Sequence, residues 1–178
     1  MILPEGGTVQ VVGRTGSGKT FYAVRSILTA LVNGRVVYTN IKLKWPAVQR
    51  YAKKKGLPNG IPKGNYRFLD HESNFHNALV EGACVFLDEA QLVWNSRDYK
   101  KTDETQREML LFLTQARHVK CTINFITQHE GNVDAQMARV AVYIIRLRNW
   151  MQLPLLRFIS ELLGKPAWMN RSVASICD

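Results

Sequence analysis

Eight residues near the start of the chain have the types and the spacing of a loop that binds phosphate groups. Residues 13–20 read GRTGSGKT and match G-x-x-x-x-G-K-[ST] at every position. The glycines let such a loop curl so that backbone N–H groups point inward at phosphate oxygens, and the following helix adds its positive dipole end. We expect Lys19 to contact the β- and γ-phosphates of ATP and the Thr20 hydroxyl to bind Mg²⁺. The other positions predicted to hold the nucleotide are Gly13, Thr15, Gly16, Ser17 and Gly18.

Two adjacent carboxylates form the second chemical element. Asp88 and Glu89 follow the continuous apolar run of residues 83–87, which is typical of a strand buried on both faces. A carboxylate at the carboxyl end of such a strand is where a phosphate-loop enzyme holds Mg²⁺, so Asp88 is assigned to the metal with Thr20. Glu89 is predicted to be the base that orients and deprotonates water, which favours hydrolysis over transfer to a small molecule. Without the phosphate loop, the same pair would equally fit a solvated turn.

Polar side chains elsewhere complete the predicted site. Gln128 ends the apolar run of residues 121–126 and is predicted to position water or contact the γ-phosphate, provided that its strand lies beside the loop strand. A simple strand-ending turn is the competing interpretation. An arginine commonly supplies the remaining charge stabilisation. Arg117, which ends a predicted helix, is the first choice, and the alternatives are Arg97, Arg139, Arg146 and Arg148.

The elements that must position these side chains alternate between strand and helix patterns. Strands are predicted at about 8–13, 35–39, 83–87, 121–126 and 140–147, and helices at about 19–33, 46–55 and 104–118. This order predicts an α/β fold of three layers with a mainly parallel sheet. The 178 residues suit one ATPase domain at 1–150, followed by a C-terminal tail or last helix at 151–178.

Positive charge is concentrated in the first half of the chain. The net charge is +10, and residues 42–67 contain eight Lys or Arg and no acid. Aromatic side chains interleaved among them are Trp45, Tyr51 and Tyr66. This pattern favours a polyanionic partner, nucleic acid ahead of a membrane surface, although a solvated helix face gives the same pattern. The Gly- and Pro-containing loop at 56–64 is the best candidate for a mobile or partner-binding insertion.

Cysteine usage and the first residues favour an intracellular location. Three widely spaced cysteines without a C-x-x-C pair predict neither disulfides nor a zinc site. Cys84 and Cys121 fall in apolar runs and are interpreted as core residues. The first residues show no signal-peptide pattern. No metal site beyond nucleotide-bound Mg²⁺ is predicted.

Several of these segments together resemble the N-terminal ATPase domain of the zonular occludens toxin (Zot) family, which includes the assembly ATPases of filamentous phages. The matching segments are GRTGSGKT with FYAV at 21–24, GRVVYTNI at 34–41, LDEAQ at 87–91, WNSR at 94–97, QARH at 115–118 and ITQ at 126–128. The family belongs to the FtsK/HerA division of P-loop ATPases. Membership implies a sheet whose sensor strand lies between the phosphate-loop strand and the Asp88 strand, which would bring Gln128 beside the γ-phosphate. It also implies a ring, commonly of six subunits, with an arginine contributed in trans.

The chain also departs from that family. Filamentous-phage members carry a transmembrane helix after the ATPase domain, whereas the Leu-rich segment at 150–168 is interrupted by Arg157, Glu161 and Lys165. We interpret the segment as the last helix covering the sheet, or alternatively as an amphipathic tail that contacts a membrane surface or a subunit. The chain is then either the cytoplasmic part of a longer protein, with membrane association through a C-terminal part not in this chain, or a soluble relative.

Three functional classes follow from these observations. The first is ATP-driven assembly and extrusion of phage DNA and coat through the envelope, in the host cytoplasm or at the cytoplasmic face of the inner membrane, with phage coat or envelope proteins as partners. The alternative is a soluble packaging ATPase that pumps viral DNA into a capsid. A nucleotide-gated ring without turnover is disfavoured because both the phosphate loop and the two acids are intact.

Overall fold

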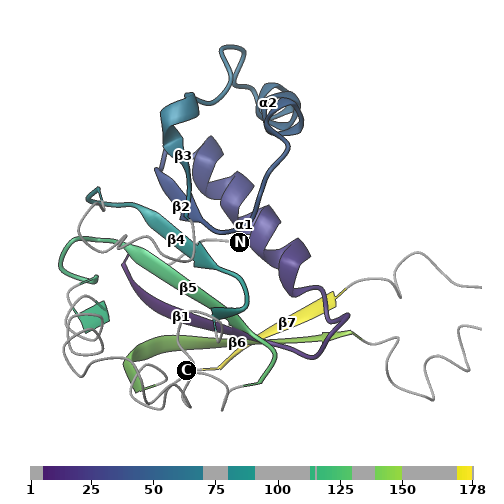
Figure 1. Ribbon diagram of the computed structural model, residues 1–178, viewed down its shortest axis with the longest axis vertical. Helices are drawn as coiled ribbons and strands as arrows, with labels where there is room; N and C mark the ends of the chain where they lie inside the picture. Colours follow the sequence, from purple (N-terminus) through teal and green to yellow (C-terminus); the bar gives the residue numbers. More distant parts are fainter. Residues whose placement is uncertain are drawn as a thin grey trace, which may run out of the picture.

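A seven-stranded sheet forms the centre of the molecule in the computed structural model, which describes residues 6–69, 80–90, 113–114, 116–129, 139–149 and 172–177 (Figure 1). The strands lie in the order β3-β2-β4-β5-β1-β6-β7. All neighbours are parallel except β6 and β7, which are antiparallel. The predicted α/β class and mainly parallel sheet are confirmed, and β5 lies between β1 and β4, as the family resemblance implied.

Most of the elements predicted from hydrophobic patterning are present, with ends that differ by one or two residues. The strands are β1 (Gly7–Val12), β2 (Val37–Thr39), β4 (Cys84–Leu87), β5 (Thr122–Thr127) and β6 (Ala141–Asn149). The helices are α1 (Lys19–Val32) and α2 (Trp45–Lys54). The helix expected at 104–118 lies largely outside the described residues, and the Leu-rich segment at 150–168 lies wholly outside them.

Two strands were not predicted. β3 (Tyr66–Phe68) follows a short 3-10 turn, η1 (Lys63–Asn65), and β7 (Ser172–Cys177) pairs with β6. β3 has only three residues, two of them exposed, and it occupies the sheet edge beside β2. A run of three residues is too short to show a strand periodicity, so β3 could not be recognised from its own sequence. The loop at 56–64 accordingly leads into the sheet edge.

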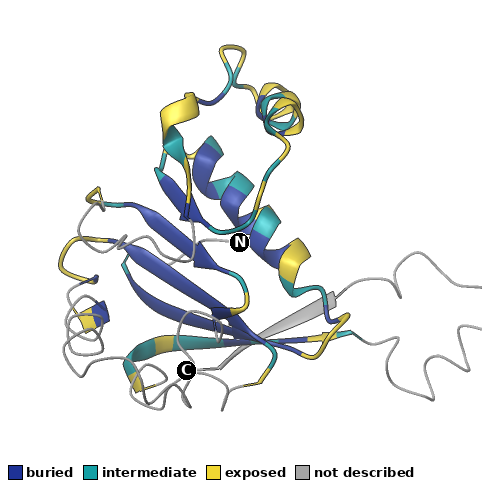
Figure 2. Cartoon of the chain, in the orientation of Figure 1, coloured by how far each residue is buried: buried dark blue, intermediate teal, exposed yellow. Residues whose placement is uncertain are grey.

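The central strands are buried on both faces (Figure 2). In β4, Cys84 and Phe86 pack in the cluster that contains α1 residues such as Ile27 and Leu31. Val85 and Leu87 alternate to the other face, where they join a cluster that also contains Leu113, Ala116, Ile123 and Phe125. This alternation is the strand periodicity of two, and it explains why the run 83–87 is apolar throughout.

The parallel arrangement determines where polar groups collect. Because the carboxyl ends of β1, β2, β4, β5 and β6 reach the same edge of the sheet, the residues that follow these strands become neighbours despite their separation in sequence. The phosphate loop follows β1, Asn40 follows β2, Asp88 follows β4 and Gln128 follows β5. Open parallel sheets bind ligands at this edge.

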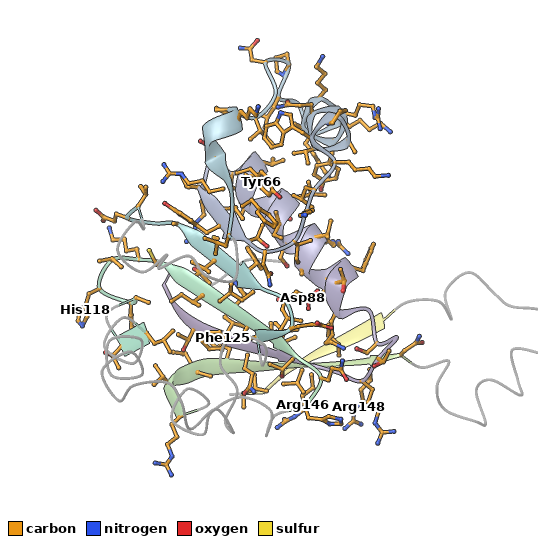
Figure 3. All side chains as sticks on the ribbon, viewed as in Figure 1. Tyr66, Asp88, His118, Phe125, Arg146 and Arg148 are labelled. Carbon is orange, nitrogen blue, oxygen red and sulfur yellow. The ribbon has the colours of Figure 1, made fainter. Side chains whose placement is uncertain are left out.

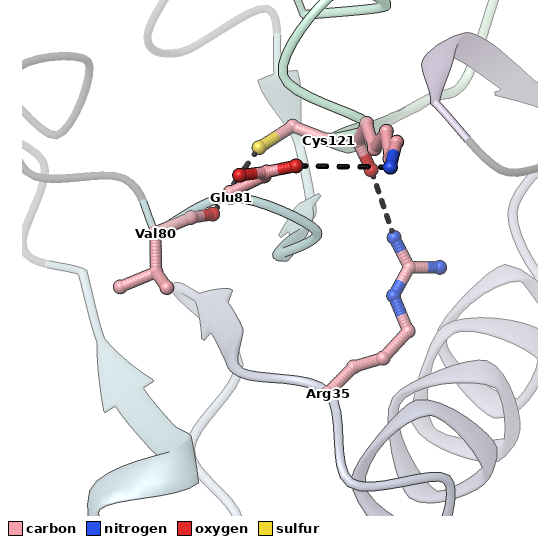
Figure 4. Close-up of polar contacts among 5 residues, drawn as sticks. Arg35, Val80, Glu81 and Cys121 are labelled. Atoms are coloured by element: carbon pink, nitrogen blue, oxygen red, sulfur yellow. Dashed lines mark hydrogen bonds and ion pairs between the residues drawn. The ribbon is translucent and has the colours of Figure 1, made fainter.

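At the opposite, amino edge, Arg35 connects the beginnings of several strands. Figure 4 shows it beside Cys121 and the segment of Val80 and Glu81. Its Nε donates to the Gly82 carbonyl at 2.7 Å, and its Nη2 lies 3.3 Å from the carbonyls of Ala83 and Lys120. The same Nη2 donates to Thr122 Oγ1 at 3.2 Å. One guanidinium thus satisfies acceptors before β4 and before β5, which is a task suited to its fork of donors.

The cysteines beside this network behave as core residues, as predicted. Burial raises the pKa of Cys84 to about 11, while the positive charge of Arg35 acts in the opposite direction. Burial also raises the pKa of Cys121, whose thiol donates to the Val80 carbonyl at 3.4 Å. Both groups therefore remain protonated thiols at neutral pH.

Replacing Arg35 by alanine is expected to lower the free energy of unfolding by about 2 kcal/mol, because partly buried carbonyls lose a charged donor. Thermal or urea unfolding followed by circular dichroism measures the change. Arg25→Ala, at an exposed position of α1, is the matched control and should change stability by less than about 0.5 kcal/mol. An Arg35→Ala protein as stable as the control would show that the network contributes nothing net.

Candidate nucleotide-binding site

The phosphate loop joins β1 to α1 at the carboxyl edge of the sheet. Gly16 and Gly18 adopt positive φ angles of 78° and 91°, which favour glycine. A Cβ atom at Gly13 would clash with Ser17 Oγ and lie 2.8 Å from the Leu147 carbonyl, so this first glycine permits close packing of the loop on β6. The three glycines of the motif are thus each required by the backbone.

The Lys19 side chain lies over the phosphate loop. Its Nζ donates to the carbonyl of Gly13 at 2.6 Å and to that of Arg14 at 3.2 Å. Burial lowers the pKa of Lys19, and the charges of Asp88 and Glu89 act against this shift. The two carboxylates therefore help to keep the ammonium charged, and that charge is available to phosphate oxygens.

The two acids follow β4 and face the loop. Thr20 Oγ1 donates to Asp88 Oδ2 at 3.2 Å, which joins the two predicted metal ligands directly. The other oxygen, Asp88 Oδ1, accepts the backbone N–H of Glu89 at 3.0 Å. Glu89 is exposed and has a φ of 51°, a left-handed conformation that is uncommon for glutamate.

A cavity of about 360 Å³ brings the predicted side chains together. It is lined by Thr15, Gly16, Gly18, Lys19, Thr20, Phe21, Asp88, Glu89, Ile126, Thr127 and Gln128. Gln128 reaches it because β5 is inserted between β1 and β4, with Val12 opposite Thr127 and Leu87 opposite Phe125. The volume falls in the usual range for small-molecule sites.

The donors in this cavity fit Mg²⁺ and a polyphosphate. A hydroxyl and a carboxylate oxygen 3.2 Å apart, at Thr20 and Asp88, are the hard oxygen ligands that Mg²⁺ prefers. A lysine ammonium and the start of a helix lie on the same side and suit phosphate oxygens. The arrangement therefore has the parts needed for phosphoryl transfer to water.

The candidate arginines separate into two groups. Arg146 and Arg148 lie near the carboxyl end of β6, at the edge that carries the phosphate loop, whereas Arg117 and Arg139 precede strands and lie at the amino edge. Figure 3 shows His118, next to Arg117 in the sequence, at the left side of the view, away from Asp88, Arg146 and Arg148. At ~3.3 Å per residue, the length of β5 puts Arg117 about 20 Å from the cavity of its own subunit. Arg97 lies outside the described residues.

Three residues of this edge were not selected by the sequence analysis. Asn40 brackets the backbone of Asp88 through two hydrogen bonds of 2.8 Å. Asn149 Nδ2 donates to the Gly16 carbonyl at 3.1 Å and ties β6 to the loop. Phe21 lines the cavity with its side chain 70% exposed. The detectable signal for Asn40 was a polar residue at a strand end, the same signal that identified Gln128.

Comparisons with known proteins identify the family. The family model described as "Zonular occludens toxin (Zot)" matches residues 8–151. The chain belongs to the zonular occludens toxin family. Among its curated relatives, the Gene 1 proteins of Enterobacteria phage I2-2 and Salmonella phage IKe are 30% and 31% identical to it, each over 146 residues. Each alignment covers 77% of this chain and 40% of the relative, so this member of the family spans about two fifths of their length.

Solved structures support the same fold. The N-terminal domain of zonular occludens toxin from Neisseria meningitidis aligns with a TM-score of 0.58 at 21% identity, covering 98% of this chain and 95% of that chain. The genome packaging NTPase B204 from Sulfolobus turreted icosahedral virus 2, in complex with AMP, aligns with a TM-score of 0.55 at 18% identity, covering 89% and 83%. At these identities the likeness establishes that this Zot-family chain has the P-loop NTPase fold. Among the described residues, no helix combines the length and apolarity required to cross a bilayer.

Proposed function

We propose that this chain is a Mg²⁺-dependent ATPase that powers the assembly and extrusion of phage DNA and coat through the bacterial envelope. The observation that carries the proposal is the convergence of Lys19, Thr20, Asp88, Glu89 and Gln128 on one cavity. Membership of the Zot family and the similarity to phage Gene 1 proteins support the biological setting. The proposed location is the host cytoplasm, at the cytoplasmic face of the inner membrane, with phage coat or envelope proteins as partners.

Each side chain of the cavity has one proposed role. Lys19 and the loop amides bind the phosphates, and the start of α1 stabilises the negative charge that develops on them. Thr20 and Asp88 hold Mg²⁺, which when bound neutralises charge on the β- and γ-phosphates. Glu89 accepts a proton from the attacking water, and Gln128 orients that water or contacts the γ-phosphate.

The basic segment, residues 42–67, supplies the proposed nucleic-acid surface. Helix α2 packs on α1 through Val48 and Ala52 and turns its cations outward. The exposed cations of the segment are Lys42, Lys44, Arg50, Lys53, Lys54, Lys55, Lys63 and Arg67. Because the segment contains no acid, nothing within it neutralises these charges, and a phosphate backbone suits them.

We further propose that several copies form a ring, commonly of six, in which Arg117 enters the site of the neighbouring subunit. Arg117 is exposed and remote from the cavity of its own subunit, as an arginine acting in trans must be. Arg117→Ala is expected to lower turnover by about 10-fold or more without weakening nucleotide binding.

Mixing Arg117→Ala with Lys19→Ala protein tests this arrangement. In a mixed ring, an intact Lys19 from one subunit meets an intact Arg117 from the next, so phosphate release should exceed that of either variant alone. A mixture no more active than its components would contradict a contribution in trans. In that case Arg148, at the nucleotide edge, would be the next residue to replace.

The proposed function is tested by steady-state phosphate release with and without single- and double-stranded DNA, at low and moderate salt. Stimulation by DNA that fades as salt rises is expected if the basic segment follows a phosphate backbone. Stimulation by double-stranded DNA alone would favour the alternative, a motor that packages viral DNA into a capsid. An absence of hydrolysis under all conditions would refute the ATPase itself.

A further inference from the structure

Asn40 makes an unusual contact with the acid that follows β4. Its Nδ2 donates to the Asp88 carbonyl and its Oδ1 accepts the Asp88 N–H, both at 2.8 Å. The backbone pairing of β2 with β4 reaches only as far as Thr39 opposite Phe86. The amide of Asn40 therefore continues the pairing beyond the end of the ladder, because a side-chain amide carries the same donor and acceptor as a peptide group.

Glu89, which follows Asp88, has a disfavoured backbone conformation. Glu89 adopts a φ of 51°, a conformation that a glutamate keeps only where its surroundings impose it. Two restraints act on it: Asn40 fixes the backbone of Asp88, and the Asp88 carboxylate accepts the Glu89 N–H at 3.0 Å. The direction of the Glu89 side chain toward the cavity thus depends on Asn40, which does not itself line the cavity.

Asn40 also begins the connection to the basic segment. The carbonyl of Ile41 accepts the Tyr66 hydroxyl at 2.9 Å, and the N–H of Leu43 donates to the same Tyr66 oxygen at 3.2 Å. The Tyr66 ring lies 5.9 Å from the ring of Trp45, the first residue of α2. Figure 3 shows Tyr66 on the α2 side of the molecule and Asp88, which lines the cavity, nearer to the middle of the sheet. A displacement of α2 or β3 therefore shifts residues 41–43, which follow Asn40 in the chain.

From this continuous set of contacts we propose that Asn40 is a positioning residue that couples occupancy of the basic segment to hydrolysis. Binding of nucleic acid to residues 42–67 shifts residues 41–43, to which the Tyr66 hydroxyl bonds. The two hydrogen bonds between Asn40 and Asp88 transmit this shift to Glu89. This inference rests on the proposed function, because it assigns a regulatory input to the same site. A purely structural role for Asn40 would make stability, and not the response to DNA, depend on it.

The test compares wild-type protein, Asn40→Ala and the control Asn33→Ala, an exposed asparagine at the end of α1. Nucleotide affinity, KM, kcat and stimulation by DNA are measured for each. Asn40→Ala should retain nucleotide affinity and KM within about 3-fold, lose about 10-fold or more in kcat, and lose its stimulation by DNA. Asn33→Ala should match the wild type. If Asn40→Ala does not fold, Asn40→Asp takes its place. Aspartate keeps the size of the side chain and the acceptor for the Asp88 N–H but loses the donor, and the same changes in kcat and in stimulation by DNA are expected.

The outcomes separate this inference from the function on which it rests. A DNA-stimulated wild type with an equally stimulated Asn40→Ala protein overturns the coupling alone, whatever the change in kcat. An unchanged kcat shows that Asn40 does not position Glu89 and also overturns it. A wild type that hydrolyses ATP without responding to DNA overturns the coupling together with the proposed nucleic-acid partner.

Discussion

Replacing Glu89 by glutamine is expected to lower ATP turnover by about 100-fold or more while nucleotide binding is retained. Glutamine has nearly the same shape, and the hydrogen bond from the backbone of residue 89 to Asp88 survives. The change removes the capacity to take a proton from water. It also removes one negative charge from the cavity, so the affinity for a polyphosphate should stay the same or rise slightly.

Binding of a fluorescent ATP analogue and steady-state phosphate release measure the two quantities separately. Glu81→Gln is a matched control, because Glu81 is an exposed glutamate that pairs with Lys120 at 3.8 Å, away from the cavity. Glu81→Gln should turn over ATP at the wild-type rate. Normal hydrolysis by Glu89→Gln would show that another group serves as the base.

Replacing Lys19 by alanine is expected to weaken ATP binding by about 100-fold or more, with loss of hydrolysis as the consequence. The ammonium supplies a full positive charge to the phosphate site, and the start of α1 adds the partial positive charge of the helix dipole. Asp88 and Glu89 would then face the phosphates without the Lys19 ammonium, and their repulsion would add to the loss.

Titration with a fluorescent ATP analogue is the measurement, and the thermal transition shows whether the variant is folded. Lys120→Ala is the matched control, because Lys120 is an exposed lysine that pairs with Glu81 outside the site. If Lys19→Ala bound ATP as tightly as Lys120→Ala, the loop would not be the phosphate site.

The part of the site that could be predicted from the sequence is the part carried by local patterns. The phosphate-loop motif and the apolar run before Asp88 each identify a strand end and its chemistry. Gln128 needed the strand order as well, since its position depends on β5 lying between β1 and β4. That order came from the family resemblance and is confirmed.

The remaining features depend on contacts between distant segments. The pair of hydrogen bonds between Asn40 and Asp88 joins residues 48 positions apart, and no local pattern indicates that β2 and β4 are neighbours. The left-handed conformation of Glu89 is likewise a result of its surroundings, because its residue type favours other conformations. β3 has three residues and is held by its pairing with β2 and by the hydrogen bonds of the Tyr66 hydroxyl to Ile41 and Leu43.

The placement of Arg117 follows from topology. A residue that precedes a parallel strand lies at the amino edge of the sheet, whereas the nucleotide site occupies the carboxyl edge. Arg117 therefore cannot serve the cavity of its own subunit, and its proposed role depends on a neighbouring copy. Arg35 lies at the same edge, where its donors form hydrogen bonds that hold the strand beginnings together.

The central claim is that the cavity between the phosphate loop and the two acids hydrolyses ATP with Mg²⁺. Phosphate release by the purified protein, measured with Mg²⁺ and again with excess chelator, tests it most directly. The account predicts turnover that requires Mg²⁺ and is restored when the metal is returned. Tight ATP binding without any release of phosphate in the presence of Mg²⁺ and DNA would contradict it and leave a nucleotide-gated structural role.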